Sequence, residues 1–71
     1  MTNTELLEQV IANSGYKKQF LASKIGLSHQ GFSNKVQNKQ DFRAKEIMIL
    51  CDLLHISVEQ KEAIFFAKNV D

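Results

Sequence analysis

The sequence is poor in the residues that punctuate or crosslink a chain, with no proline, three glycines and one cysteine among 71 residues. A single cysteine cannot form an internal disulfide. Cys51 lies in an apolar series with Ile47, Leu50 and Leu54, so we interpret it as a small core residue. The two histidines have no second cysteine to join them in a zinc site, which needs about four closely spaced ligands. We therefore expect no metal and no cofactor.

Targeting segments and catalytic sets are also missing. The first ten residues, MTNTELLEQV, have neither the basic region nor the apolar region of a secretory signal, so the expected location is the cytoplasm. No apolar run is long enough to span a bilayer, so we expect no membrane partner. The sequence has no Ser/His/Asp set, no carboxylate pair in a plausible pocket and no phosphate-cradling glycine loop. We therefore expect that the protein is not an enzyme.

The composition is that of a small globular protein, with 44% apolar and 24% charged residues. A chain of this length buries only about 60% of the surface that its unfolded form exposes, so its core is small. We expect one soluble domain over residues 1–71, with few residues left over for an active-site cleft.

The charge is distributed unevenly, although the net charge is only +1. Residues 17–45 contain seven basic residues and one acidic residue, a net charge of +6. Residues 1–16 carry −2 and residues 46–71 carry −3. The middle of the chain is therefore basic and is flanked by acidic segments.

Apolar residues recur at helical spacing in five short segments, and no useful length alternates with the period of a β-strand. Capping residues mark where these helices begin: a Thr2–Glu5 capping box, Ser28, and a Ser57–Gln60 capping box. We predict a compact all-α fold of five helices. The predicted helices cover about 2–13, 17–25, 28–36 and 43–54, and the fifth opens at 57.

The second and third predicted helices have the arrangement of a helix-turn-helix, over about residues 17–37. Ala22 is small where the two helices must approach, and Gly26 supplies the tight turn four residues later. The third helix has apolar residues only at Phe32 and Val36, and the rest of "SHQGFSNKVQNK" is almost entirely neutral and polar or basic. Its exposed face is thus rich in amides, which are poor helix formers but good partners for base edges.

The segment "KKQFLASKIGLSHQGFSNKVQNK" resembles the helix-turn-helix of the phage-repressor family, the Cro and lambda-repressor-like domains, and the resemblance covers roughly residues 4–66. The chain departs from that family in two places. Lys17 and Lys18 stand where members often have Ser or Thr followed by Gln. Lys35 stands where an apolar residue is common, with Val36 taking the buried role.

The resemblance implies a lambda-repressor-like fold and a regulator of transcription that binds double-stranded DNA in the major groove. It further implies a homodimer on two half-sites and, most often, repression by blocking polymerase in a phage, prophage or bacterial mobile element. Such a protein works in the bacterial cytoplasm and associates with the nucleoid when bound to DNA. The chain is either a complete regulator of Cro size or the DNA-binding piece of a longer repressor.

The resemblance also implies which residues contact DNA. The start of the third helix supplies the base contacts, and Gly31 lets this helix approach the DNA backbone closely. The predicted base-reading residues are His29, Gln30, Ser33, Asn34 and Gln37. Phosphate contacts come from cations and polar groups that flank the reading helix. The predicted phosphate-binding residues are Lys18, Ser28, Asn38, Lys39 and Arg43.

Two alternatives remain open at this stage. The same scaffold serves as a protein-interaction module, such as an antitoxin or anti-repressor that docks its third or fifth helix on a protein. Phe65 and Phe66 are adjacent and face different sides of one helix, which fits either a wide core stripe or a dimer interface. We expect Phe66 to be the exposed one.

Overall fold

The computed structural model describes residues 1–66, and this part of the chain folds into five α-helices without a β-strand. The prediction of an all-α, five-helix fold is confirmed, and each helix end for which a position was predicted lies within about two residues of it. The helices are α1 (Thr4–Ser14), α2 (Lys18–Lys24), α3 (His29–Val36), α4 (Ala44–Leu54) and α5 (Val58–Phe65). None of them is both long and apolar enough to cross a membrane.

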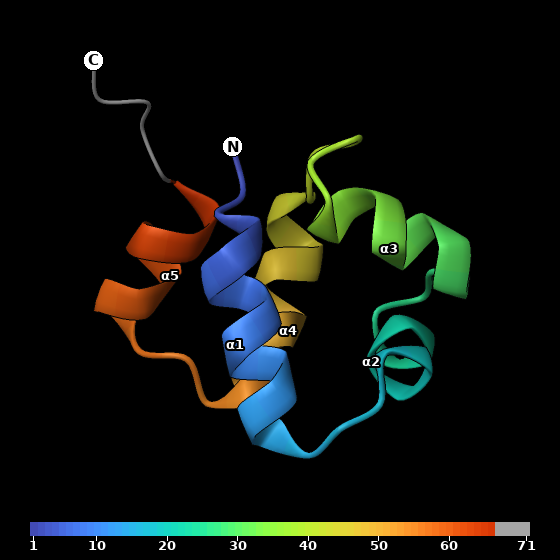
Figure 1. Ribbon diagram of the computed structural model, residues 1–71, viewed down its shortest axis with the longest axis horizontal. Coiled ribbons are helices and arrows are strands. Elements are labelled where there is room, and N and C mark those ends of the chain that lie inside the picture. The colour runs from blue at the N-terminus through green and yellow to red at the C-terminus, as the bar shows by residue number, and fades with distance from the viewer. Residues whose placement is uncertain (67–71) are drawn as a thin grey trace.

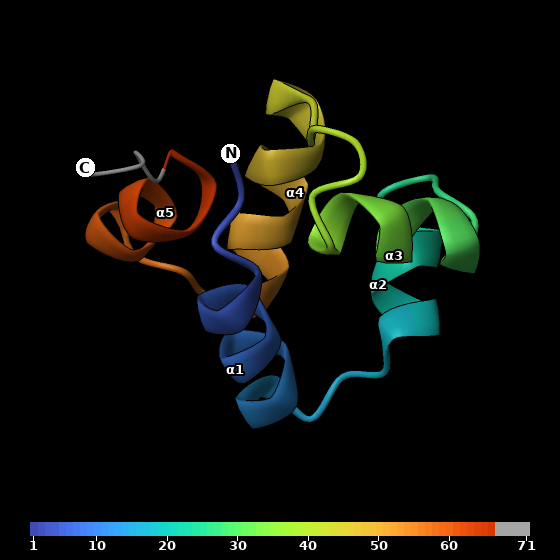
Figure 2. The same cartoon turned by 45° about the horizontal axis from the view of Figure 1, so that its top comes forward.

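The helices are arranged around a central pair (Figure 1). Helices α1 and α4 lie side by side, α5 packs against α1 on one flank, and α2 and α3 lie on the other flank. Figure 2 shows the same division from a second direction, with α2 beneath α3. Helix α3 thus lies at the opposite end of the molecule from α5.

All five helices contribute to one apolar core, which anchors the back of α3. Its fully buried side chains are Leu7, Leu21, Phe32, Val36, Leu50 and Ile64. A series of edge-to-face aromatic contacts crosses this core, with ring centroids 6.2 Å apart for Phe32 and Phe42 and 5.4 Å apart for Phe42 and Phe65. The series connects α3 with α5, so Phe65 is a core residue.

The predicted helix starts are correct at α3 and α5 but wrong at α1. Ser28 accepts a hydrogen bond from the Gly31 N–H at 3.0 Å, and Ser57 and Gln60 form the predicted reciprocal capping box. At α1 the N-cap is Asn3, which accepts a hydrogen bond from the Leu6 N–H at 3.1 Å. Thr2 does not cap this helix, because its backbone is bound to a residue distant in the sequence.

The N-terminal residues tie the end of α3 to the end of α5. The Thr2 N–H donates to Asn38 Oδ1 at 2.8 Å, and Asn38 Nδ2 donates back to the Thr2 carbonyl. Thr4 Oγ1 donates to the Val36 carbonyl at 2.6 Å, and the Asn3 N–H donates to the Ile64 carbonyl at 2.5 Å. These bonds fix the C-terminal end of α3 against the body of the domain.

Candidate nucleic-acid interface

The turn between α2 and α3 sets the angle at which α3 leaves the domain. Gly26 has a φ of 78°, in the left-handed region that a glycine adopts at no steric cost. The Leu27 N–H donates to the Ala22 carbonyl at 2.9 Å and closes the end of α2. Ala22 is almost fully buried, which lets the two helices approach closely. Helices α2 and α3 therefore pack against each other as one unit around this turn.

Helix α3 divides cleanly into an inner and an outer face. Phe32, Lys35 and Val36 point into the domain and are buried. The five predicted base-reading residues lie on the remaining surface, where His29, Gln30 and Gln37 are exposed and Ser33 and Asn34 are half-buried. The fold therefore leaves all five side chains at least partly accessible, four on α3 and Gln37 at its C-cap. Helix α3 itself lies at the edge of the molecule (Figure 2).

Two of these side chains are bound to each other. Gln30 Nε2 donates a hydrogen bond to Asn34 Oδ1 at 2.9 Å, across one turn of the helix. The bond orders two long polar side chains before any ligand arrives. The bond also leaves the two amides with different free groups. One N–H of Gln30 and the side-chain oxygen of Asn34 are already engaged.

The predicted phosphate-binding residues divide into three that remain available and two that are engaged. Lys39 and Arg43 are exposed, and no ion pair within residues 1–66 involves either of them. Ser28 accepts from Gly31, and its own hydroxyl hydrogen stays free to donate. Lys18, in contrast, forms an ion pair with Glu8 at 2.8 Å, which offsets its charge.

Asn38 holds the N-terminal segment, which the sequence alone did not indicate. The oxygen and the nitrogen of its side-chain amide are both bonded to the backbone of Thr2, and its own backbone adopts a φ of 65°. Asparagine tolerates this left-handed conformation better than most residues. The side chain predicted to contact phosphate is thus engaged within the domain.

A buried ion pair behind α3 is the main feature that the sequence did not reveal. Lys35 Nζ lies 2.7 Å and 2.9 Å from the two carboxylate oxygens of Glu46, and both side chains are only about a tenth exposed. Glu46 Oε1 also accepts from the Arg43 N–H at 2.9 Å. The pair therefore connects the inner face of α3 with the start of α4, next to a predicted phosphate contact.

The surroundings of Glu46 favour its charged form. Burial by itself raises the pKa of this carboxyl. The hydrogen bonds from Lys35 and from the Arg43 backbone, together with the positive charges of these two residues, outweigh burial and lower the pKa below its usual value of 4.5. The carboxylate therefore stays ionised and keeps the Lys35 ammonium compensated.

A cluster of two aromatic rings and a lysine at α2 is a second feature that the sequence analysis did not predict. Tyr16 and Phe20 stack with their ring centroids 5.0 Å apart, and Lys24 Nζ lies 5.4 Å from the Phe20 ring. Both rings are about two-fifths exposed. Tyr16, Phe20 and Lys24 are spaced four residues apart, from just before α2 to its last residue. This spacing is a sequence signal that indicates the cluster.

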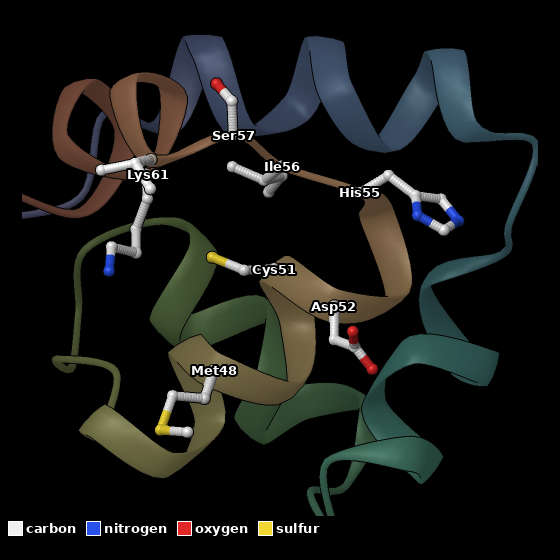
Figure 3. Close-up of a pocket in the computed structure, with 8 residues that line it drawn as sticks. Met48, Cys51, Asp52, His55, Ile56, Ser57 and Lys61 are labelled. Atoms are coloured by element: carbon white, nitrogen blue, oxygen red, sulfur yellow. The ribbon is translucent and has the colours of Figure 1, made fainter.

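A hollow of about 560 Å³ lies on the surface between α4 and the start of α5 (Figure 3). Cys51, Asp52, His55 and Lys61 are among its lining residues, and the Cys51 sulfur and the His55 ring point in different directions. Burial raises the pKa of the Cys51 thiol, and the positive charge of Lys61 only partly opposes this. The predicted core role of Cys51 agrees with its half-buried position against the core.

No group of three or more histidine, cysteine or acidic side chains in residues 1–66 is arranged to hold a metal ion.

Comparison with known families gives one finding that bears on the protruding helix. The family model described as the Cro/C1-type HTH DNA-binding domain matches residues 6–60, where HTH denotes helix-turn-helix. The match begins within α1, covers α2, α3 and α4 completely, and ends within α5. Searches of curated proteins and of solved structures found no match.

Proposed function

We propose that this chain, which belongs to the Cro/C1-type HTH DNA-binding domain family, is a sequence-specific regulator of transcription that reads duplex DNA with α3 in the major groove. It acts as a repressor that blocks polymerase at its operator, in a phage, a prophage or a bacterial mobile element. It binds as a homodimer on two half-sites one helical turn apart, about 34–36 Å. Its place of action is the nucleoid DNA of the bacterial cytoplasm.

The observation that carries this proposal is the hydrogen-bonded amide pair on the outer face of α3. Gln30 and Asn34 lie on a helix held from behind by Phe32 and by the Lys35–Glu46 ion pair. Amides that donate and accept in one plane match the major-groove edges of bases. A helix presented in this way supplies base contacts without a large rearrangement of the domain.

The charges around α3 support binding to the DNA backbone. Lys39 and Arg43 follow α3 directly and are exposed, and Ser28 at its start retains a free donor. Groups at both ends of a reading helix are suited to two flanking phosphates. Lys18 and Asn38 contribute less, because Glu8 and Thr2 already engage their side chains.

The proposed dimer contact lies at the end of α5, at the opposite end of the molecule from α3. Phe66 follows α5 and is 52% exposed, whereas Phe65 is buried in the core. Of the two phenylalanines that are candidates for a dimer contact, only Phe66 has an exposed side chain. A large apolar side chain exposed at this level is a suitable contact for a second copy.

Selection of bound duplexes from a random DNA pool tests the proposal. We expect a recovered operator with two related half-sites, and binding that weakens strongly as the salt concentration rises. Recovery of unrelated sequences would refute sequence-specific reading.

A protein-interaction module on the same scaffold is the second candidate. It is favoured by the apolar surface of α4 and α5, where Met48 and Val58 are each more than 70% exposed. Protein docking through these side chains would change far less with salt than DNA binding would. Salt titration against the selected duplex therefore separates the two candidates.

A further inference from the structure

The hydrogen bond between Gln30 and Asn34 determines which groups each amide has left for DNA. Gln30 Nε2 carries two hydrogens and donates one of them to Asn34 Oδ1 at 2.9 Å. Gln30 therefore keeps its carbonyl oxygen and one N–H. Asn34 keeps both hydrogens of its amide nitrogen, while its oxygen is engaged.

These remaining groups match two different base edges. A bidentate contact with adenine needs one acceptor for N6 and one donor for N7, which is what Gln30 retains. Asn34 retains two donors, which suit a base that presents acceptors in the major groove. Guanine does so with N7 and O6, and thymine with O4.

The spacing of the amide pair fits neighbouring base pairs. Successive base pairs are about 3.4 Å apart along the duplex. Because their amides are bonded to each other, Gln30 and Asn34 are held close enough to reach neighbouring base pairs.

The backbone beneath the pair is fixed at both ends of α3. The Ser28 cap orders the first turn, and the Lys39 N–H donates to the Asn34 carbonyl at 2.8 Å beyond the last turn. Phe32, which lies between the two amides in the sequence, is fully buried. Ordering of both side chains in the free protein lowers the entropic cost of binding.

We infer that Gln30 and Asn34 read two adjacent base pairs as one coupled unit, with Gln30 bound to an adenine and Asn34 donating to a guanine or thymine on the neighbouring pair. This inference rests on the proposed function and adds the bases that the site selects. Asn34 has two tasks in it, since it contacts its own base and also holds Gln30 in position.

Two substitutions of Asn34 separate these two tasks when they are measured in the full chain beside Gln30→Ala and a control. Asn34→Ala removes both the donors and the acceptor that supports Gln30. Asn34→Asp removes the donors but keeps an acceptor for Gln30 Nε2. Gln9→Ala removes an exposed amide from α1 and is the matched control, because it lies outside the proposed interface. Thermal unfolding of each variant verifies that the fold is retained.

The measurement is the affinity of each variant for the selected operator and for its single-base variants. The Gln30 position is the base pair at which Gln30→Ala loses the preference of the parent, and we expect that preference to be for adenine, by about 5- to 160-fold. Asn34→Ala should lower that adenine preference by at least about twofold, the lower limit for coupled side chains in contact. Asn34→Asp should keep it, bind more weakly overall, and shift the neighbouring preference toward cytosine, whose N4 is a donor. Gln9→Ala should match the parent at every position.

The outcomes distinguish this inference from the proposed function. If the parent selects an operator but Asn34→Ala changes preference only at its own base pair, the coupled unit is refuted and DNA reading stands. The same holds if the base under Gln30 is not adenine. If the parent selects no duplex at all, the proposed function itself fails.

Discussion

Replacement of Lys35 by methionine is expected to destabilise the domain severely, because it leaves the Glu46 carboxylate buried without its cation. The two side chains are 10% and 11% exposed and form a bidentate pair at 2.7 Å and 2.9 Å. Loss of one partner of a buried pair costs about 3–5 kcal/mol. The total stability expected for a domain of this size is only about 4–11 kcal/mol. A single substitution on the inner face of α3 thus removes a large share of the free energy of unfolding.

A double variant separates the charge effect from the loss of packing. Lys35→Met combined with Glu46→Gln removes both charges, and the glutamine oxygen is still able to accept from the Arg43 N–H as Glu46 does at 2.9 Å. Replacement of a whole buried pair by uncharged groups is often nearly neutral. We therefore expect the double variant to be more stable than Lys35→Met alone. Urea unfolding at 25 °C and pH 7 measures both free energies.

The same pair predicts how stability depends on pH. The pKa of Glu46 is lowered in the folded protein, so folding favours its ionised form and the pair stabilises the domain above the ordinary pKa of 4.5. As the pH falls below 4.5, the unfolded chain takes up a proton that the folded chain binds less well, and this contribution is lost. The parent should lose more stability than the double variant over this acid range.

Three results would contradict this reasoning. A cost of Lys35→Met below about 1 kcal/mol, the usual value of an exposed pair, would mean that Glu46 is not desolvated as its position indicates. Equal loss of stability by the parent and the double variant below pH 4.5 would mean that Glu46 does not carry the acid effect. A double variant less stable than Lys35→Met would mean that packing, rather than charge, dominates at this site.

Four further predictions concern residues of the surface and the core. Lys39→Ala should weaken binding about equally on all duplexes and reduce the slope of log affinity against log salt by about 1; a changed operator preference with an unchanged slope would contradict its phosphate role. Phe66→Ser should raise the monomer fraction in sedimentation at tens of micromolar, and an unchanged fraction would exclude this residue from the dimer contact. Phe32→Ala, which empties a fully buried position, should cost roughly 3–5 kcal/mol in urea unfolding. Gln30→Ala should instead leave the unfolding transition in place and relax base preference in operator-variant binding, so a stability loss with unchanged preference would argue against α3 as the reader.

Local patterns predicted the helices because each pattern depends on residues within a few positions of one another. The Ser57–Gln60 box is predicted from two residues three positions apart and the Ser28 cap from the helical segment that follows it, and both caps are present. Gly26 marked the turn for the same reason, since its φ of 78° is a local requirement. Helical spacing also separated the buried Phe32 and Val36 from the accessible amides of α3.

The same local reasoning failed where a distant partner competes for the same groups. Thr2 fits a capping box with Glu5, but its backbone is bound by Asn38, 36 residues away, and Asn3 caps α1 instead. That contact exists only after the end of α3 and the N-terminus have come together. The same contact engages the side chain of Asn38, for which the sequence analysis predicted a phosphate contact.

Tertiary structure alone decided the surroundings of the reading helix. The sequence shows that Lys35 departs from the family pattern but not why. Its partner Glu46 lies 11 residues away on another helix, and no local pattern links the two. The adjacency of Phe65 and Phe66 showed that they face different directions, and the Phe42 ring on the core side of α5 accounts for the burial of Phe65. Periodicity determines which residues share a face of a helix, whereas the packing of other helices determines what that face meets.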